Sequence, residues 1–203
     1  MIFPTSKAEY KIIKEIYENP GINISTLLKK TRTSPQAGYK YIKELLKAQI
    51  IKEAKEGEKP ILRRFYPNFS EVGKLIFALI EENKKQDFLN IHPIFKGAII
   101  QFEKEIIDQV DCVLIFGSFA RKSETKESDV DMLVLGKKEI KKYIEKLTER
   151  AFITIRNKIS LRFNKTKDFI KKIENNDSFA VQIQKEHVVT VNAKKWVEIV
   201  SEL

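Results

Sequence analysis

Two aspartates stand one residue apart at the start of an apolar run, and their spacing is the first sign of chemistry in this sequence. Asp129 and Asp131 lead into "MLVL" at residues 132–135. On an extended strand, residues i and i+2 point to the same face, so two carboxylates should lie side by side. Burying such a pair without a positive partner is costly. Mg²⁺ and Mn²⁺ bind carboxylate oxygens together with substrate phosphates, so we expect one of these ions here.

A Gly-Ser pair upstream is the second candidate for chemistry. Gly117 and Ser118 follow the apolar run "CVLIF" at residues 112–116. Glycine lets the backbone approach a ligand closely, and N–H groups at a helix start, with a serine hydroxyl, bind phosphate. Arg121 and Lys122 come next in the chain and would neutralise phosphate charge. We therefore expect these residues to bind a nucleotide beside the metal site.

The stretch "LIFGSFARKSETKESDVDMLVL" contains both features and resembles the minimal nucleotidyltransferases of the polymerase-β superfamily. The residues that match the family pattern in order and spacing are Gly117, Ser118, Ala120, Arg121, Ser128, Asp129 and Asp131. The resemblance covers roughly residues 95–200. It implies that Gly117 and Ser118 hold the β- and γ-phosphates of a nucleoside triphosphate, and that Asp129 and Asp131 are the catalytic, Mg²⁺-binding acids. It also implies transfer of a nucleoside monophosphate to an acceptor hydroxyl, with release of pyrophosphate.

The sequence departs from that family at two places. The family often has glycine where Lys122 stands, and its active members usually supply a third carboxylate from a later strand. The matching segment here is "KISLRFN" at residues 158–164, where Arg162 or Asn164 takes that place. Asp168 is the nearest acid, in the helix or turn that follows. Two acids suffice to bind one Mg²⁺-nucleotide, whereas activation of an acceptor hydroxyl stays open.

The chain before this region predicts three helices within residues 6–48 and then two strands, at residues 50–55 and 61–66. Ser34 suits a helix N-cap and Pro35 the first helical position, so the third helix should begin there. The predicted order of elements resembles a winged helix-turn-helix DNA-binding domain: two helices, a short turn, a third helix and a hairpin. In such domains the third helix enters the major groove and the hairpin forms the wing.

The predicted contacts to double-stranded DNA fall into three groups. Residues 21–49 hold six basic residues and one acid, as phosphate binding requires. We expect phosphate contacts from Lys29, Lys30 and Arg32. We expect groove contacts from Gln36, Tyr39, Lys40 and Lys43, and wing contacts from Arg63 and Arg64. Winged helices also serve as protein–protein modules, and that alternative stays open.

Residues 70–85 predict a fourth helix that connects two domains. Its apolar stripe comprises Val72, Leu75, Ile76, Leu79 and Ile80. The stripe either forms a homodimer interface or packs on its own domain. The helical pattern breaks at about residues 84–93, where His92 is expected in a turn or at the surface. We therefore predict a winged helix domain with a connector helix over residues 1–85 and a nucleotidyltransferase-like domain over residues 86–203.

The sequence of the second domain predicts helices that alternate with strands around a small mixed sheet, a fold of the α/β (α+β) class. Strands are expected at residues 112–117, 129–136, 158–164 and 187–192. Helices are expected at residues 94–107, 137–152, 166–175, with Thr166 as N-cap, and 193–203.

Composition limits the cellular setting. The formal net charge is +10, of which residues 1–85 carry 17 basic and 10 acidic residues, a net of +7. This bias favours a polyanionic partner for the first domain. Cys112 is the one cysteine and is expected in the core, so no internal disulfide forms and a reducing cytoplasm fits best. No apolar stretch reaches the roughly 20 residues that a membrane span needs.

Three functions agree with these features. The first is a DNA-binding nucleotidyltransferase that uses Mg²⁺ and a nucleoside triphosphate. The second is a transcriptional regulator whose degenerate transferase domain senses a nucleotide or is inactive. The third is a component of a toxin–antitoxin pair, which would have a toxin or antitoxin protein as its partner.

Overall fold

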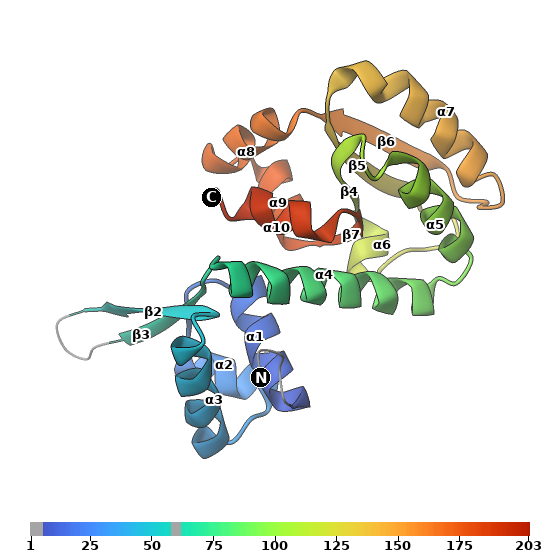
Figure 1. Ribbon diagram of the computed structural model, residues 1–203. Coiled ribbons are helices and arrows are strands. Elements are labelled where there is room, and N and C mark those ends of the chain that lie inside the picture. Colours follow the sequence, from blue (N-terminus) through green and yellow to red (C-terminus); the bar gives the residue numbers. More distant parts are fainter. Residues whose placement is uncertain (1–5, 58–61) are drawn as a thin grey trace. The chain divides into compact units, whose positions relative to one another are not determined.

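The computed structural model describes residues 6–57 and 62–203 (Figure 1). The chain divides into two compact units, Met1–Ile80 and Glu81–Leu203. The division lies inside one long helix, α4 (Glu71–Ile91). Each unit is treated by itself below.

The first unit is a helical bundle with a strand hairpin. Its helices are α1 (Lys7–Glu18), α2 (Ile24–Thr31) and α3 (Pro35–Lys47). Each helix begins at a side chain that accepts a backbone N–H, as the N-cap pattern requires, and these residues are Ser6, Asn23 and Ser34. The helices enclose a core of fully or almost fully buried residues, among them Ile12, Ile13, Ile16, Leu27, Ile42, Leu45 and Phe65. The predicted start of the third helix, with Pro35 in its first turn, is confirmed.

The hairpin is formed by β2 (Ile51–Glu56) and β3 (Leu62–Pro67), which pair antiparallel. The short strand β1 (Ile22–Asn23) pairs with the other side of β3, so the sheet order is β1-β3-β2. Gly57 opens the predicted turn with a φ of +86°. The rest of that turn, residues 58–60, lies outside the described residues.

Helix α4 is longer than the sequence predicts. The polar run "KKQD" suggested an end near residue 85, but the helix continues to Ile91. Its last turns bury Phe88 and Leu89 in the core of the second unit, and no helix-breaking residue occurs before Pro93. Tertiary packing therefore extends the helix through a stretch whose polar residues alone would favour a loop. The boundary at residue 85 stays a prediction.

The second unit contains a sheet in the order β6-β5-β4-β7. Strands β4 (Val110–Phe116), β5 (Val130–Gly136), β6 (Ile159–Asn164) and β7 (His187–Val191) form it. Strand β5 is parallel to β6 and antiparallel to β4, and β4 is antiparallel to β7. The helices are α5 (Phe95–Ile106), α6 (Ser118–Arg121), α7 (Lys141–Ala151) after a 3₁₀ turn η1 (Lys138–Ile140), α8 (Thr166–Glu174), α9 (Ser178–Lys185) and α10 (Ala193–Val200). The mixed α/β class is confirmed.

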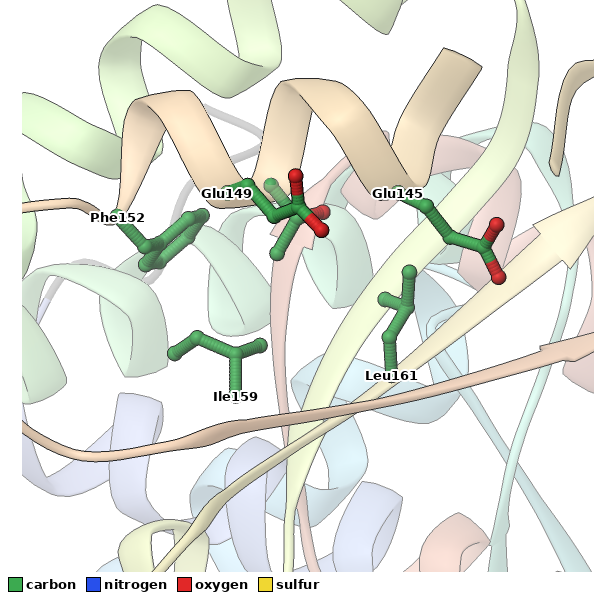
Figure 2. A pocket seen from close by; sticks show the side chains of 6 residues that line it. Glu145, Glu149, Phe152, Ile159 and Leu161 are labelled. Atoms are coloured by element: carbon green, nitrogen blue, oxygen red, sulfur yellow. The ribbon is translucent and has the colours of Figure 1, made fainter. Parts of the chain in front are cut away.

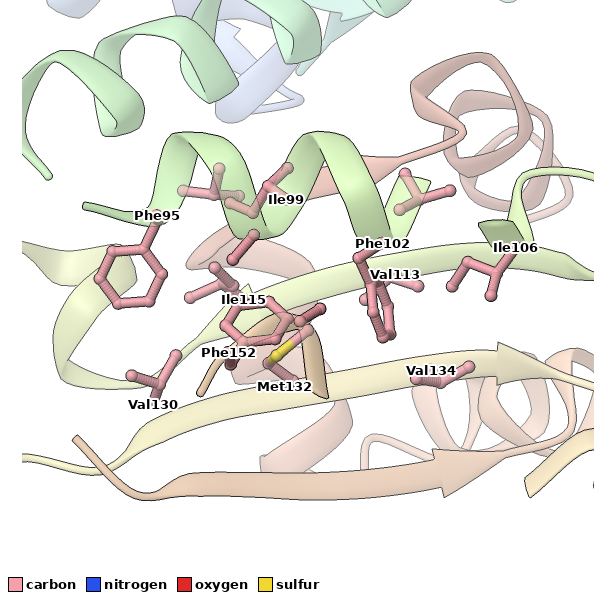
Figure 3. Packing of buried hydrophobic residues seen from close by; sticks show 14 of the residues in the cluster. Phe95, Ile99, Phe102, Ile106, Val113, Ile115, Val130, Met132, Val134 and Phe152 are labelled. Atoms are coloured by element: carbon pink, nitrogen blue, oxygen red, sulfur yellow. The ribbon is translucent and has the colours of Figure 1, made fainter. Parts of the chain in front are cut away.

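Two cores lie on the two faces of this sheet. On one face α5 and α7 cover Val113, Ile115, Val130, Met132 and Val134 (Figure 3). On the other face α8, α9 and α10 cover a second set, which comprises Cys112, Leu114, Phe116, Leu133 and Leu135. The central strands are apolar on both faces, as expected of strands that are covered on both sides. Cys112 is fully buried, so its predicted place in the core is confirmed.

Two details differ from the sequence analysis. Thr166 is not the N-cap of α8, because Lys165 holds that position and the Thr166 hydroxyl instead donates a hydrogen bond to Asp111. The sequence analysis also missed α9, whose N-cap Asp177 accepts the N–H of Ala180 at 2.9 Å. Over the described ranges, no helix combines the length and apolar character that crossing a membrane would take.

Candidate functional site

Strand β5 presents Asp131 at its beginning, on the face covered by α8, α9 and α10. Successive side chains of a strand point to opposite faces of the sheet. Val130 and Met132, on either side of Asp131, are fully buried on the face covered by α5, so Asp131 points to the other face (Figure 3). Asp129 directly precedes the strand and is exposed, and Asp131 is half-buried. The two acids flank Val130, whose N–H donates to the carbonyl of Lys158 at 2.8 Å. The carboxylates thus stand where the strand emerges from its apolar surroundings.

Gly117 brings the Gly-Ser turn against the second aspartate. Phe116, the residue before it, is the Cα partner of Asp131 across the β4–β5 pair. At Gly117 the backbone takes φ +74° and ψ −148°, a conformation that is essentially restricted to glycine. A Cβ on this residue would lie 2.5 Å from Oδ2 of Asp131. Glycine is therefore required twice here, by the backbone angles and by the approach of the carboxylate.

Ser118 begins the short helix α6, and Arg121 ends it. The first N–H groups of a helix have no partner within it, so they are available to a ligand. Nη1 of Arg121 lies 3.4 Å from Oε2 of Glu186, the residue after α9. Lys122 is exposed and holds a left-handed backbone with φ 59°. The structure thus gathers the four predicted phosphate-binding residues at one turn, with one arginine paired to an acid.

A network of hydrogen bonds fixes the loop that leads from α6 to Asp129. Nδ2 of Asn157 donates to the carbonyls of Ser128 at 2.9 Å and Lys126 at 3.3 Å. Oγ of Ser128 accepts the N–H of Thr125 at 2.9 Å. Sequence analysis missed Asn157, because a lone asparagine in a polar segment carries no signal of its own. It acts as a positioning residue for the loop that precedes Asp129.

His92 lies in the turn between α4 and α5, as predicted, and its carbonyl accepts the N–H of Phe95 at 3.1 Å. Its side chain is only 12% exposed and lies 3.5 Å from Glu124 of the same loop. Its ring packs against Phe88, Phe95 and Phe119. The continuation of α4 to Ile91 brings this histidine into an aromatic cluster and away from the surface.

The place of a third carboxylate is taken by a hydroxyl. Ser160 of β6 is the Cα partner of Asp131, whereas Arg162 and Asn164 lie opposite Leu133 and Leu135, farther along the sheet. Asp168 lies in the first turn of α8, beyond the opposite end of β6, so it does not join the pair. Among the described residues, no group of three or more histidine, cysteine, aspartate or glutamate side chains could hold a metal ion.

The pair of aspartates nevertheless fits one divalent cation that is completed by phosphate oxygens. Carboxylates are the hard oxygen donors that Mg²⁺ prefers, and Mg²⁺ usually takes one or two of them together with substrate phosphates. The close packing of Asp131 on Gly117 keeps one carboxylate beside the turn where phosphates would bind. Within the described part of the chain the donor set comprises two acids, whereas a two-metal site generally uses three.

A cavity of about 460 Å³ lies elsewhere in the same unit, between α7 and β6 (Figure 2). Ile159 and Leu161 line it from the strand, on the opposite face from Asp131. Glu145 and Glu149 approach it from the helix. Two acids would repel phosphates, so this cavity does not extend the nucleotide site.

A buried ionic network ties the second half of α4 to β7. Glu81 is fully buried, with Oε1 lying 3.3 Å from Nε2 of His187 and Oε2 lying 3.1 Å from Nζ of Lys84. Burial alone would raise the pKa of the Glu81 carboxyl, but the charges of His187 and Lys84 and their hydrogen bonds outweigh it and lower the pKa to about 2. His187 is the Cα partner of Phe116, so the network lies one residue from Gly117.

In the first unit, α3 presents an exposed polar face. Gln36, Tyr39, Lys40 and Lys43 are all exposed on it, while Gly38, Ile42 and Leu45 are buried on the other face. A leucine of α2 touches the glycine: a Cβ on Gly38 would fall 2.1 Å from Cδ2 of Leu28. This packing holds α3 close to α2 and directs its polar face outward, as contact with a DNA groove requires.

The basic residues at the end of α2 adjoin a second set of cations. A pocket of about 420 Å³ is lined by Lys30, Thr31 and Arg32 from α2 and its C-cap, and by Lys11, Lys14, Glu15 and Glu18 from α1. Lys30 pairs with Glu15 at 2.6 Å, and Lys29 is exposed. Lys11 and Lys14 are not among the predicted contacts, because nothing in the sequence shows that α1 lies beside the end of α2.

The wing arginines are engaged within the hairpin. Arg63 pairs with Glu53, and this hydrogen bond raises the pKa of the guanidinium, burial opposing it. Arg64 pairs with Glu56 and donates from Nη1 to the carbonyl of Gly21 at 2.9 Å. Either side chain must leave these partners to reach a phosphate, so their DNA contacts stay predictions.

The apolar stripe of α4 is largely covered within the chain. Ile76 and Ile80 are 3% and 0% exposed, whereas Leu75 is 59% exposed. Phe77, which the stripe did not include, is fully buried and stacks on Tyr17 with ring centroids 4.7 Å apart. Packing within the chain therefore accounts for much of the stripe, and the homodimer stays a prediction.

Comparison with known families identifies two domains in the chain. Residues 98–195 match the family model described as polymerase beta, nucleotidyltransferase. Residues 6–52 match the model described as winged helix-turn-helix DNA-binding. The matches thus support a nucleotidyltransferase-like domain that is preceded by a winged helix domain of the DNA-binding type. A search of curated proteins returned no match.

Proposed function

We propose that this protein is a DNA-binding, Mg²⁺-dependent nucleotidyltransferase that moves a nucleoside monophosphate from a nucleoside triphosphate to an acceptor hydroxyl and releases pyrophosphate. The observation that carries the proposal is the contact between Gly117 and Asp131. It joins a phosphate-binding turn to a pair of carboxylates, and these are the two parts that attack on an α-phosphate requires.

The residues of the site divide the work. The N–H groups and hydroxyl at Ser118 bind the outer phosphates, and Arg121 and Lys122 neutralise their charge. Asp129 and Asp131 would hold the metal ion, which when bound supplies Lewis-acid stabilisation of the reacting phosphate. Asn157 keeps the loop before Asp129 in place through its two hydrogen bonds to backbone carbonyls.

A second function is favoured by one observation. Ser160 stands opposite Asp131, and among the described residues no third acid joins the pair to bind the ion that would activate an acceptor hydroxyl. A regulator that binds a Mg²⁺-nucleotide and reports it to the winged helix needs only the two acids. In both proposals the winged helix binds double-stranded DNA in the cytoplasm. A toxin or antitoxin partner and a homodimer through residues 70–85 remain proposals as well.

Calorimetric titration of ATP, GTP, CTP and UTP into the full chain, with Mg²⁺ and then with EDTA, tests nucleotide binding. We expect Mg²⁺-dependent binding that is lost in the Asp129→Asn/Asp131→Asn variant and kept in Asp108→Asn, an exposed acid outside the site. Absence of binding by the folded wild-type protein would contradict both functions.

An assay of nucleotide transfer distinguishes the enzyme from the nucleotide-sensing regulator. Pyrophosphate release and incorporation of label from an α-phosphate-labelled triphosphate would be followed with duplex DNA, RNA and a cell extract as acceptors. Incorporation that the double aspartate variant abolishes supports the enzyme. Binding without incorporation into any acceptor supports the nucleotide-sensing regulator.

DNA binding is tested by titrating duplex DNA at several salt concentrations. Binding should fall steeply as the salt concentration rises, and Lys40→Ala and Lys43→Ala should weaken it. Lys74→Ala, outside α3, serves as the control. Binding that survives both substitutions and high salt would show that α3 does not enter the groove.

A further inference from the structure

An exposed aromatic ring lies on the face of the sheet that carries Asp131, the face covered by α8, α9 and α10. Phe179, at the beginning of α9, is 37% exposed. The guanidinium carbon of Arg162 lies 4.7 Å from the centroid of its ring. The ring also packs on Phe116 in an edge-to-face arrangement, with centroids 5.5 Å apart. We call the side chains of Phe179 and Arg162 the aromatic shelf.

Strand register places this shelf beside the site. Phe116 is the Cα partner of Asp131 on one side of β5, and Ser160, two residues before Arg162, is its partner on the other side. Residues two apart on a strand share a face. Phe179 touches a side chain from each flanking strand, so it lies over β5 at the end where Asp131 emerges.

The rest of α9 continues along the phosphate-binding turn. Glu186, just after the helix, contacts Arg121, and Gln182 donates to Glu186 at 3.1 Å. The helix therefore extends from the shelf to the phosphate-binding arginine. A molecule with phosphates at Ser118 and Arg121 and a flat group at Phe179 would lie along this helix.

We propose that the aromatic shelf binds the base of the nucleotide, an inference that rests on the proposed nucleotide site. Bases stack on phenylalanine rings and on arginine guanidinium planes. Exposure distinguishes Phe179 from the other rings of its core, since Phe169 and Trp196 are 1% and 0% exposed. Phe179 thus combines an exposed surface with a cation against its ring, on the face of the sheet that carries Asp131.

The chemistry of the shelf also indicates the class of nucleotide. The strength of stacking depends on the area of the flat face of a base and not on the hydrogen-bond donors and acceptors at its edge. Purines have the larger face. The shelf should therefore favour ATP and GTP over CTP and UTP and discriminate weakly within each class.

Calorimetry with the full chain, Mg²⁺ and two kinds of probe tests this proposal. The probes are the four nucleoside triphosphates and inorganic triphosphate, which has the phosphates but no base. Phe179→Ala should weaken ATP binding by about 5- to 150-fold, the effect of losing one base–aromatic stack. It should leave the affinity for inorganic triphosphate unchanged, and Phe179→Trp should restore ATP binding. Tyr143→Ala, which removes another exposed aromatic ring from α7, should change neither.

Each other result would overturn the proposal in a recognisable way. Equal affinity of the wild-type protein for ATP and inorganic triphosphate would support the phosphate site but refute base binding by the aromatic shelf. Equal weakening of both probes by Phe179→Ala would assign the ring a role in packing alone. Failure of the wild-type protein to bind either probe would refute the nucleotide site itself. Equal affinity for all four nucleotides would refute the purine preference.

Discussion

Replacing Gly117 with alanine should reduce both stability and nucleotide binding, because two constraints meet at this residue. Its φ of +74° with ψ of −148° costs other residues about 1–3 kcal/mol. The new Cβ would also lie 2.5 Å from Oδ2 of Asp131, well inside van der Waals contact. Since that oxygen ends a flexible side chain, the carboxylate would rotate away and leave the position from which we propose it holds Mg²⁺.

The expected effects are separate and measurable. Urea denaturation should show a loss of about 1–3 kcal/mol in the free energy of unfolding from backbone strain. Calorimetry should show about 10- to 100-fold weaker binding of Mg²⁺-ATP, as when the support of a metal ligand is disturbed. Gly136→Ala is the control, because a Cβ at this end of β5 would meet Val110 at 3.5 Å, an ordinary contact.

A double-mutant cycle separates the clash from the strain. In an Asp131→Ala background the carboxylate is absent, so Gly117→Ala should cost less stability than it does in the wild-type protein. The strain at φ +74° should remain. Wild-type stability and wild-type affinity in Gly117→Ala would refute the reasoning, because neither the backbone angles nor the approach to Asp131 would then matter.

Three further perturbations test the surroundings of the site. Glu186→Gln frees Arg121 from its acid at 3.4 Å, so Mg²⁺-ATP should bind up to about 5-fold more tightly in calorimetry, and unchanged affinity would show that the pair is unimportant. Asn157→Ala removes two hydrogen bonds to the loop before Asp129, so amide exchange at residues 125–128 should accelerate, with a stability loss of about 1 kcal/mol. In the folded protein the pKa of Glu81 is about 2, against a usual value of 4.5. The ionised carboxylate therefore contributes its full stabilisation above pH 4.5 and loses it as the pH falls toward 2. The stability gap between the wild-type protein and Glu81→Gln, measured by denaturation, should therefore narrow by about 3 kcal/mol over that interval, and a constant gap would contradict the pairing with His187.

The predicted elements follow from local rules that act along the chain. Ser34 and Pro35 define the start of α3 because capping involves neighbours in sequence. The extension of α4 past residue 85 could not be predicted in this way, since it depends on Phe88 and Leu89 entering a core built by distant strands. Helix α9 was missed for the same reason: its buried residues Ala180 and Ile183 gain their partners from other elements.

The sequence by itself determined the candidate chemistry, because residue type and spacing select it. A Gly-Ser turn and two acids at i and i+2 predict a phosphate site and a cation site, and period-two alternation alone predicts both acids on one face. The tertiary structure decided which residues join them. Register across the sheet placed Ser160 opposite Asp131 and left Asp168 at the far end, and packing of α9 brought Phe179 and Glu186 to the site from more than 45 residues away. Such contacts depend on how strands pair and helices pack, and no local pattern in the chain encodes them.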